Sequence, residues 1–208
     1  MASAVCMVTA LSGCGTAADG GGAFSTSGLI NDIAHRLAES ETLTYTATFS
    51  QGVSVAHAQD PTRTAYTYPG GVVLILSGAA TSCATIKAKT TCKTSAPGAA
   101  GSTVTPAVDN TIEHAGLVRT EKVISMLTQI SLNADAIISE QDRTLAGTNA
   151  TCITITGVPA DERFSACVTD DGLLGSFTGA VAGTPIDLEL SHFVMSTEVN
   201  AFVLPRAA

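Results

Sequence analysis

The sequence of 208 residues contains few charged side chains, few aromatic rings and no tryptophan. Only 13% of the residues are charged, and ten Lys and Arg are scattered along a chain whose formal net charge is −8. A protein that binds a nucleic-acid backbone needs a basic stripe or patch. The composition therefore argues against nucleic acid as a partner.

Long apolar runs are also missing beyond the first residues of the chain. The run from Val72 to Leu76 has five residues, whereas a membrane-spanning helix needs about 20. We therefore expect any membrane contact to come through a covalently attached lipid.

Common catalytic and metal-binding signatures are absent. The sequence has no Gly-x-Ser-x-Gly elbow, no His-Glu-x-x-His pair and no Gly-x-x-x-x-Gly-Lys loop. Asp170-Asp171-Gly172, a pair of carboxylates, is typical of a turn between strands. We therefore expect no catalysis, no metal and no cofactor. The four histidines lack metal-ligand spacing, and we expect them to have structural roles: His35, His57, His114 and His192.

The N-terminal stretch Leu11-Ser12-Gly13-Cys14 resembles a bacterial lipobox, the site at which the cysteine receives diacylglycerol. The preceding residues are apolar or small and contain no acidic group, as in a signal peptide, although the usual initial positive charge is missing. A Gly-rich spacer follows. The resemblance implies a signal peptide at 1–13, a lipidated Cys14 with a tether at 14–26, and one domain at 27–208. The alternative is a buried N-terminal helix or strand with Cys14 as an ordinary thiol.

An exported protein meets an oxidising environment, so the four remaining cysteines after Cys14 should form disulfides. A hairpin with a turn at 158–161 places Cys152 opposite Cys167, at a separation that a disulfide accepts. The same reasoning pairs Cys83 with Cys92 about Lys87-Ala88, where no Gly or Asn supports a tight turn. A zinc site is the competing interpretation, and the absence of Cys-x-x-Cys spacing disfavours it.

Hydrophobic periodicity predicts an α+β protein. Apolar residues at helical spacing follow Ser25-Thr26-Ser27 up to about Ser40, and a second helical segment covers 108–134. The stretch 42–49 alternates apolar residues with threonine, and further short strands are expected at 53–58, 63–68, 72–76, 136–144, 151–158, 163–169, 173–181 and 186–190. Such strands have one apolar face. We therefore expect a curved antiparallel sheet, an incomplete barrel, wrapped over two helical segments.

This order of elements resembles the LolA/LolB and LppX/LprG superfamily of bacterial, here actinobacterial, envelope lipoproteins. Four short segments also resemble sequences of actinobacterial lipoproteins: 44–49, 60–63, 167–174 and 202–205. The order of elements ends with an expected C-terminal strand. In that superfamily the sheet curls over helices and encloses a cavity for acyl chains. The resemblance implies a cavity lined by Leu43, Tyr45, Phe49, Leu74, Leu76, Val123, Leu127, Ile130, Ile186, Leu188 and Leu190.

The resulting functional hypothesis is a non-catalytic lipoprotein, anchored to the cell membrane on its extracytoplasmic side. It binds or carries a lipid, a glycolipid or another hydrophobic molecule, and we expect a monomer. One alternative is an envelope interaction or sensor module without a cavity. Another is a secreted hydrolase, which requires His57, His114 and a carboxylate in one cleft.

Overall fold

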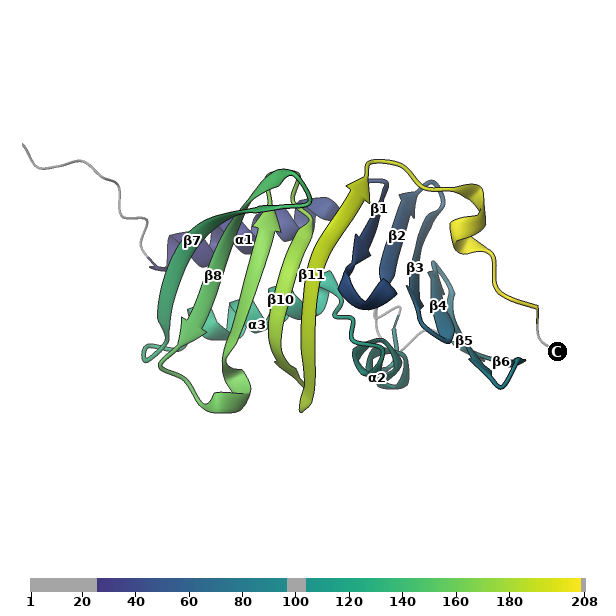
Figure 1. Cartoon of the computed structure of the whole chain (residues 1–208). Coiled ribbons are helices and arrows are strands. Elements are labelled where there is room, and N and C mark those ends of the chain that lie inside the picture. The colour runs from purple at the N-terminus through teal and green to yellow at the C-terminus, as the bar shows by residue number, and fades with distance from the viewer. Residues whose placement is uncertain (1–25, 97–103, 207–208) are drawn as a thin grey trace, which may run out of the picture.

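The structure is a computed structural model that describes residues 26–96 and 104–206. The predicted signal peptide, Cys14 and nearly all of the predicted tether lie outside the described residues. Within the described ranges the chain forms three α-helices and one eleven-stranded antiparallel sheet, which is not closed into a barrel (Figure 1). The α+β prediction is therefore confirmed.

The sheet consists of two meanders of sequential hairpins. The first contains β1 (Tyr45–Phe49), β2 (Ser54–Gln59), β3 (Thr62–Tyr68), β4 (Gly71–Leu76), β5 (Ala79–Ile86) and β6 (Lys89–Ser95). The second contains β7 (Ile137–Leu145), β8 (Thr148–Thr156), β9 (Phe164–Thr169), β10 (Leu174–Val181) and β11 (Thr184–Val194). Antiparallel pairing of β1 with β11 joins them, so β6 and β7 are the two edge strands.

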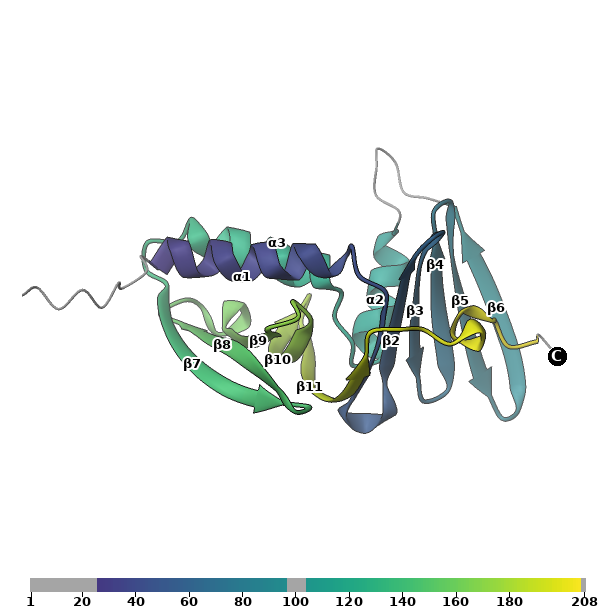
Figure 2. The ribbon, with the colours of Figure 1, turned by 90° about the horizontal axis from the view of Figure 1, so that it is seen from above.

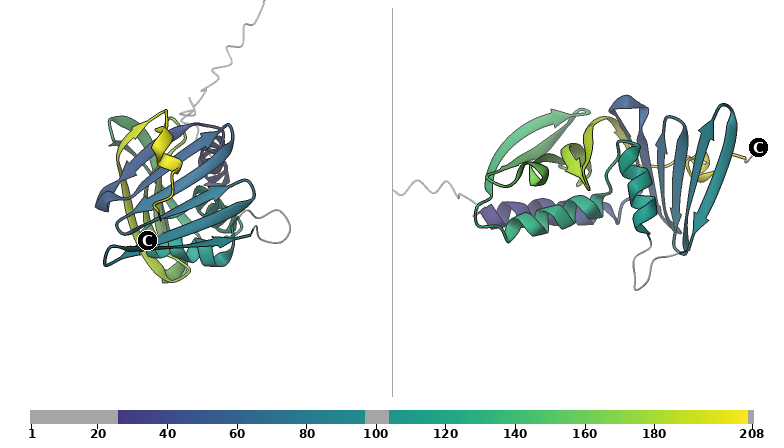
Figure 3. Two further views of the ribbon diagram at one scale, coloured as in Figure 1. Left: turned by 90° about the vertical axis from the view of Figure 1, so that its right-hand side faces the viewer. Right: turned by 90° about the horizontal axis from the view of Figure 1, so that it is seen from below.

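All three helices lie on one face of this sheet (Figures 2 and 3). The helices α1 (Thr26–Ser40) and α3 (Thr120–Ser131) pack side by side in opposite directions across the concave face of the second meander. The shorter α2 (Pro106–His114) contacts β4, β5 and β11 near the junction of the meanders. The helices therefore cover both halves of the sheet.

Helical spacing places the apolar residues of α1 and α3 against the sheet. Ile33 and Leu37 of α1 are fully buried, as are Val123 and Leu127 of α3. These side chains form one continuous hydrophobic core with the inward-facing residues of the strands. Burial of apolar surface in this core is the main favourable contribution to folding.

The predicted second helical segment is two helices instead of one. The helix α2 ends at His114, and a short connection containing Gly116 at φ +79° leads to α3. This left-handed conformation is one that glycine adopts without strain, and it ends helices. The apolar stripe continued through the connection because Leu117 and Val118 are also buried, so periodicity alone did not reveal the break.

The C-terminal segment crosses the outer face of the first meander and does not add the expected final strand. It forms a short 3₁₀ helix, η3 (Val199–Phe202), and Phe202 packs on Ala65 and Leu74 of the sheet. The guanidinium carbon of Arg63 lies 4.3 Å from the centre of the Phe202 ring. This contact covers part of a sheet face that the sequence predicts to be solvated.

Both disulfides are present with the predicted pairings, Cys83–Cys92 and Cys152–Cys167. In each hairpin the two cysteines are directly opposite in the register. The β5–β6 turn is made by Lys87 at φ +50° and Ala88 at φ +63°, which explains how a tight turn forms without Gly or Asn.

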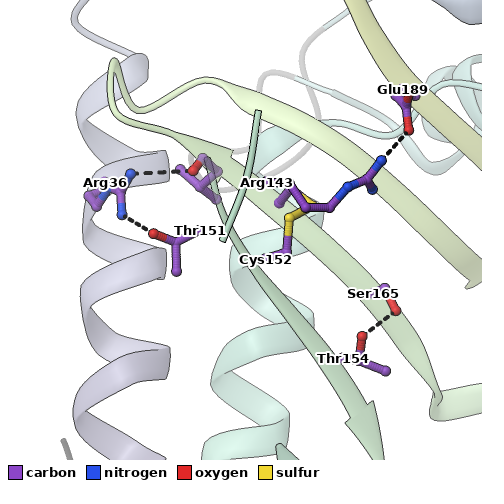
Figure 4. Close-up of a disulfide and its surroundings, with 9 residues drawn as sticks. Arg36, Arg143, Thr151, Cys152, Thr154, Ser165 and Glu189 are labelled. Atoms are coloured by element: carbon purple, nitrogen blue, oxygen red, sulfur yellow. Dashed lines mark hydrogen bonds and ion pairs between the residues drawn. A yellow bond between two sulfur atoms is a disulfide. The ribbon is translucent and has the colours of Figure 1, made fainter. Parts of the chain in front are cut away.

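Arg36 connects α1 to the second meander beside the Cys152–Cys167 disulfide (Figure 4). Its guanidinium donates hydrogen bonds to the Thr169 carbonyl at 2.7 Å and to the Thr151 hydroxyl at 3.3 Å.

The turn that follows β9 approaches the same part of α1. Gly172 adopts φ +84°, and a Cβ atom on it would lie 2.7 Å from the carbonyl oxygen of Arg36.

We expect the substitution Gly172→Ala to lower the free energy of unfolding by about 2 kcal/mol, since alanine at this φ is strained and its methyl group meets the α1 backbone. Urea unfolding followed by circular dichroism measures the change. Gly78→Ala is the matched control, because nothing lies within 4 Å of a Cβ atom there. Equal stability of the two variants would contradict this account of the α1 contact.

Candidate functional site

Most of the residues expected to line a cavity lie between the helices and the sheet. Leu43 is partly buried against the main core, and the others are members of it: Tyr45, Phe49, Val123, Leu127, Ile130, Ile186, Leu188 and Leu190. A void bounded by Tyr45, Phe49 and Leu173 has a volume of about 20 Å³. That volume is close to the space of a single water molecule. An acyl chain therefore does not fit at this point in the conformation described.

Two of the expected lining residues, both on β4, are not part of the main core. Leu74 lies under the C-terminal segment on the outer face of the sheet, and Leu76 is 43% exposed. The inward side chains of β4 are Val73 and Ile75. Leu74 therefore lies away from the space between the helices and the sheet, whereas Leu76 borders a smaller cleft described below. The run 72–76 is apolar on both faces, so its alternation gave no sign of which residues point inward.

Two larger clefts lie at the end of the molecule where α3 ends and β7 begins. The Met126 cleft has a volume of about 310 Å³ and is lined by Lys122, Met126, Gln129, Ile130, Asp161, Glu162, Phe164, Ala180, Val181 and Ala182. The Ala134 cleft has a volume of about 330 Å³ and is lined by Ser27, Ile30, Ile130, Ser131, Leu132, Asn133, Ala134, Ala136 and Ile138. The buried Ile130 side chain contributes to both clefts.

Exposed apolar side chains surround this end. Leu132 is 84% exposed and lines the Ala134 cleft, and Ile137, the first residue of β7, is 63% exposed. The N-terminal end of α1 lies beside the end of α3 and the start of β7 (Figure 2). The two clefts and their apolar rim therefore lie close to the start of α1, where the described chain begins.

A third, polar cleft of about 100 Å³ lies between the end of α1, the start of α3 and the inner face of β1–β4. Its lining includes Glu41, Tyr45, His57, Tyr66, Arg119 and Glu121. We use the name polar cleft for this site. It adjoins the 20 Å³ void, because Tyr45, Tyr66 and Thr120 line both.

Hydrogen bonds hold the histidine of the polar cleft. His57 Nδ1 lies 2.8 Å from the Thr64 hydroxyl, and its Nε2 lies 3.1 Å from the Glu41 carbonyl oxygen. The Gln59 amide donates to the same carbonyl oxygen. The ring of Tyr45 stacks on the imidazole with a centroid separation of 5.8 Å. His57 therefore has a fixed orientation, with both ring nitrogens engaged.

An ion-pair network closes the opposite side of the polar cleft. Arg119 Nε lies 2.6 Å from the Asp109 carboxylate, and its Nη1 lies 3.0 Å from the Glu121 carboxylate. The Arg119 side chain is 14% exposed. The guanidinium thus joins α2 to the first turn of α3, and its charge is shared between two carboxylates.

Burial changes the acid–base properties of the groups in the polar cleft. It raises the pKa of the Glu41 carboxyl from 4.5 to about 7, with a further rise from the charge of Glu121 and a smaller opposing effect of Arg119. Burial lowers the pKa of His57, so its imidazole is neutral at pH 7. A carboxyl with such a pKa in a cleft is typical of a functional site, although structural networks also produce it.

The histidines expected to be structural are distributed over the molecule. His114 Nδ1 lies 2.8 Å from the Asn110 carbonyl oxygen on the exposed side of α2, and it lines a different, open groove from that of His57. His35 lies 3.6 Å from the Glu39 carboxylate on α1. The grouping of His57, His114 and a carboxylate that a hydrolase requires is not brought together in one cleft of the described residues.

The described ranges contain no group of three or more His, Cys, Asp or Glu side chains arranged to hold a metal ion. Among the same residues, no helix has both the length and the apolar character needed to cross a bilayer. The sequence matches neither the protein-family models nor the curated proteins with which it was compared.

Sequence reasoning did not find the polar cleft, although one signal pointed to it. His57 follows Val53 and Val55, which are buried, at two-residue intervals along the strand. The strand pattern therefore predicts that His57 also faces inward. Glu41 and Arg119 carried no such signal, because they lie in connections that follow α1 and precede α3.

The raised pKa of Glu41 makes stability depend on pH. Between pH 4.5 and 7 the folded protein keeps a proton on Glu41 that the unfolded chain has lost, so stability falls as the pH rises through this window. Glu41→Gln removes this dependence. We expect its stability relative to wild type to improve by on the order of 1–2 kcal/mol from pH 5 to pH 8, allowing for solvent screening of a half-buried group.

Urea unfolding of both proteins at pH 5, 6, 7 and 8 measures this difference. Glu140→Gln, at an exposed position of β7, is the control and should follow the wild-type curve. Parallel pH profiles for wild type and Glu41→Gln would show that Glu41 is not held in its protonated form.

Proposed function

We propose that this protein is an exported lipoprotein, anchored to the cell membrane through Cys14, that binds a lipid or another hydrophobic molecule without catalysis. The observation that carries the proposal is the pair of clefts that meet at Ile130 under an apolar rim. In this part of the molecule α1 and α3 form a helical layer over the curved sheet (Figure 3).

The dimensions of the two clefts support a ligand with an acyl chain. Each has a volume of a little over 300 Å³, which is within the range of small-molecule sites. Met126, Phe164 and Ile138 supply apolar contact surface. The polar lining residues come from α1, from α3 and the loop after it, and from the 3₁₀ turn Ala160–Glu162. Burial of an alkyl chain contributes about 0.8 kcal/mol for each CH₂ group.

The position of the clefts suits a ligand that comes from a bilayer. The helix α1 begins at Thr26, twelve positions after Cys14. Twelve extended residues span at most about 40 Å. An acyl anchor on Cys14 therefore keeps the apolar rim at Leu132 and Ile137 within reach of the membrane surface on the extracytoplasmic side.

A second candidate function is an envelope interaction or sensor module. The same exposed residues, Leu132 and Ile137, favour it, because an apolar patch of this kind also suits a protein partner. The two candidates differ in whether a lipid fills the clefts, since a docked protein needs only the rim.

The anchoring part of the proposal is tested by Cys14→Ser. We expect wild-type protein, expressed in a bacterium that processes lipoproteins, to sediment with membranes and to carry a diacylglyceryl group by mass spectrometry. The Cys14→Ser variant should be released into the soluble fraction, because the thiol is the site of alkylation. An unmodified Cys14 in membrane-free wild-type protein would refute the anchor and leave the binding hypothesis intact.

The binding part is tested by filling the clefts. Ala180→Trp adds a ring to the Met126 cleft, and Ala134→Trp adds one to the Ala134 cleft, while both leave Ile130 in place. We expect each to weaken binding of a fluorescent fatty acid at least ten-fold, and the double variant to abolish it. Ala84→Trp, at an exposed position of β5, is the control and should bind like wild type.

Native mass spectrometry of the same variants gives an independent measurement. Wild-type protein should retain co-purified lipid, and the double variant should not. Circular dichroism establishes that each variant is folded. Undiminished fatty-acid binding in the folded double variant, or no lipid on wild-type protein by either method, would overturn the binding hypothesis.

A further inference from the structure

The polar cleft contains a carboxyl group without a counter-ion. The side-chain carboxyl of Glu41 makes no hydrogen bond or ion pair within the described part of the chain, although its backbone carbonyl accepts hydrogen bonds from His57 and Gln59. The nearest guanidinium, that of Arg119, is already paired with Asp109 and Glu121. Glu41 is therefore a half-buried acid whose charge is not neutralised by a direct partner.

The lining of the polar cleft carries two carboxyl groups, Glu41 and Glu121, and two guanidinium groups, Arg63 and Arg119. Three carboxyl groups, Glu41, Glu121 and Asp109, face the guanidinium of Arg119 on the helix side of the sheet. The guanidinium carbon of Arg63 lies over the Phe202 ring, and its buried Nε has no hydrogen-bond partner among the described residues. A bound cation would give the Glu41 carboxylate a direct partner.

Two tyrosine rings and an isoleucine form part of the walls of the polar cleft, beside its charged and hydroxyl-bearing residues. Tyr45 and Tyr66 are buried and line the cleft, and Ile75 lies beside them. Aromatic rings next to a carboxylate are the usual surroundings of a bound ammonium group. The volume of the polar cleft is about 100 Å³, compared with about 310 and 330 Å³ for the clefts at Ile130. A cleft of this size suits a compact ligand such as a methylated ammonium head.

We propose that the polar cleft binds an organic ammonium ion, with Glu41 as its counter-ion and the rings of Tyr45 and Tyr66 as its walls. This site is distinct from the clefts at Ile130, and the inference goes beyond the proposed lipid binding and does not depend on it. An ammonium group is present both in free amines such as choline and in the head groups of zwitterionic lipids.

Proton release accompanies binding at such a site. Burial raises the pKa of Glu41 to about 7, so a cation that binds the ionised form must displace a proton below that pH. The other groups that face Glu41 are Glu121 and Arg119, whose charges pair with each other, and His57, whose protonation at lower pH also disfavours a cation. Both effects make the affinity rise with pH.

Isothermal titration calorimetry of the full-length protein with choline chloride tests the proposal. We expect saturable binding that strengthens about ten-fold from pH 6 to pH 8, since the ionised fraction of a group with a pKa near 7 increases by that factor. Titration at pH 6.5 in two buffers with different ionisation enthalpies should reveal proton release. Tetramethylammonium should compete with choline, and potassium chloride at the same ionic strength should not.

Matched variants identify the residues that bind the cation. Glu41→Gln preserves the shape of the side chain and should remove binding and its pH dependence, whereas Glu140→Gln should bind like wild type. Tyr66→Phe keeps the ring and should retain binding, whereas Tyr66→Leu should weaken it. Thermal unfolding establishes that each variant is folded, so that a loss of binding is assigned to the cleft.

A competition experiment with dihexanoyl-phosphatidylcholine distinguishes a lipid head group from a free amine as the source of the ammonium group. If this lipid competes with choline in wild-type protein and in Ala134→Trp alike, the cleft recognises a lipid head group independently of the Ile130 clefts. If only free amines bind, the ligand is a small soluble cation. The absence of choline and ethanolamine binding at millimolar concentrations, equal binding by Glu41→Gln, or an affinity independent of pH would each overturn the proposal.

Discussion

The pairing of β1 with β11 is the constraint on which the rest of the structure depends. Every other neighbouring pair of strands in the sheet is a sequential hairpin, which can form locally. The pairing of Thr46 with Val194 and of Thr48 with His192 joins residues from opposite ends of the described chain. Such a contact closes a long loop, so it forms only when the hydrophobic core that both meanders share repays the entropy of closure.

This junction also determines where the polar cleft lies. The chain passes from α1 through Glu41 into β1, so the strand that joins the two meanders positions the carboxyl group. The connection from α2 to α3 then brings Arg119 to the opposite wall. The clefts at Ile130 depend instead on the packing of α1 and α3 over the second meander. The two sites therefore rest on different parts of the fold.

Local patterns in the sequence predicted the elements whose geometry is local. The alternation of 42–49 and the register that places Cys152 opposite Cys167 depend only on the two-residue repeat of a strand. The same rule fails for Leu74, since a fully apolar run does not reveal which of its faces is inward. The polar cleft was beyond local reasoning because Glu41, His57 and Arg119 come from separate elements. Only the inward alternation of His57 was visible beforehand.

The linear order of the strands gives the molecule a long axis. The entry of α1 and the edge strand β7 lie at one end, and the β5–β6 hairpin lies at the other (Figure 1). With neighbouring strands about 4.8 Å apart, eleven strands extend about 50 Å along the sheet. If the protein is anchored through its N-terminus as proposed, the tip of that hairpin, with Ile86 70% exposed, lies at the end of the molecule away from the anchor. The disulfide Cys83–Cys92 links the two strands of this hairpin, in which β6 has no neighbouring strand on its outer side.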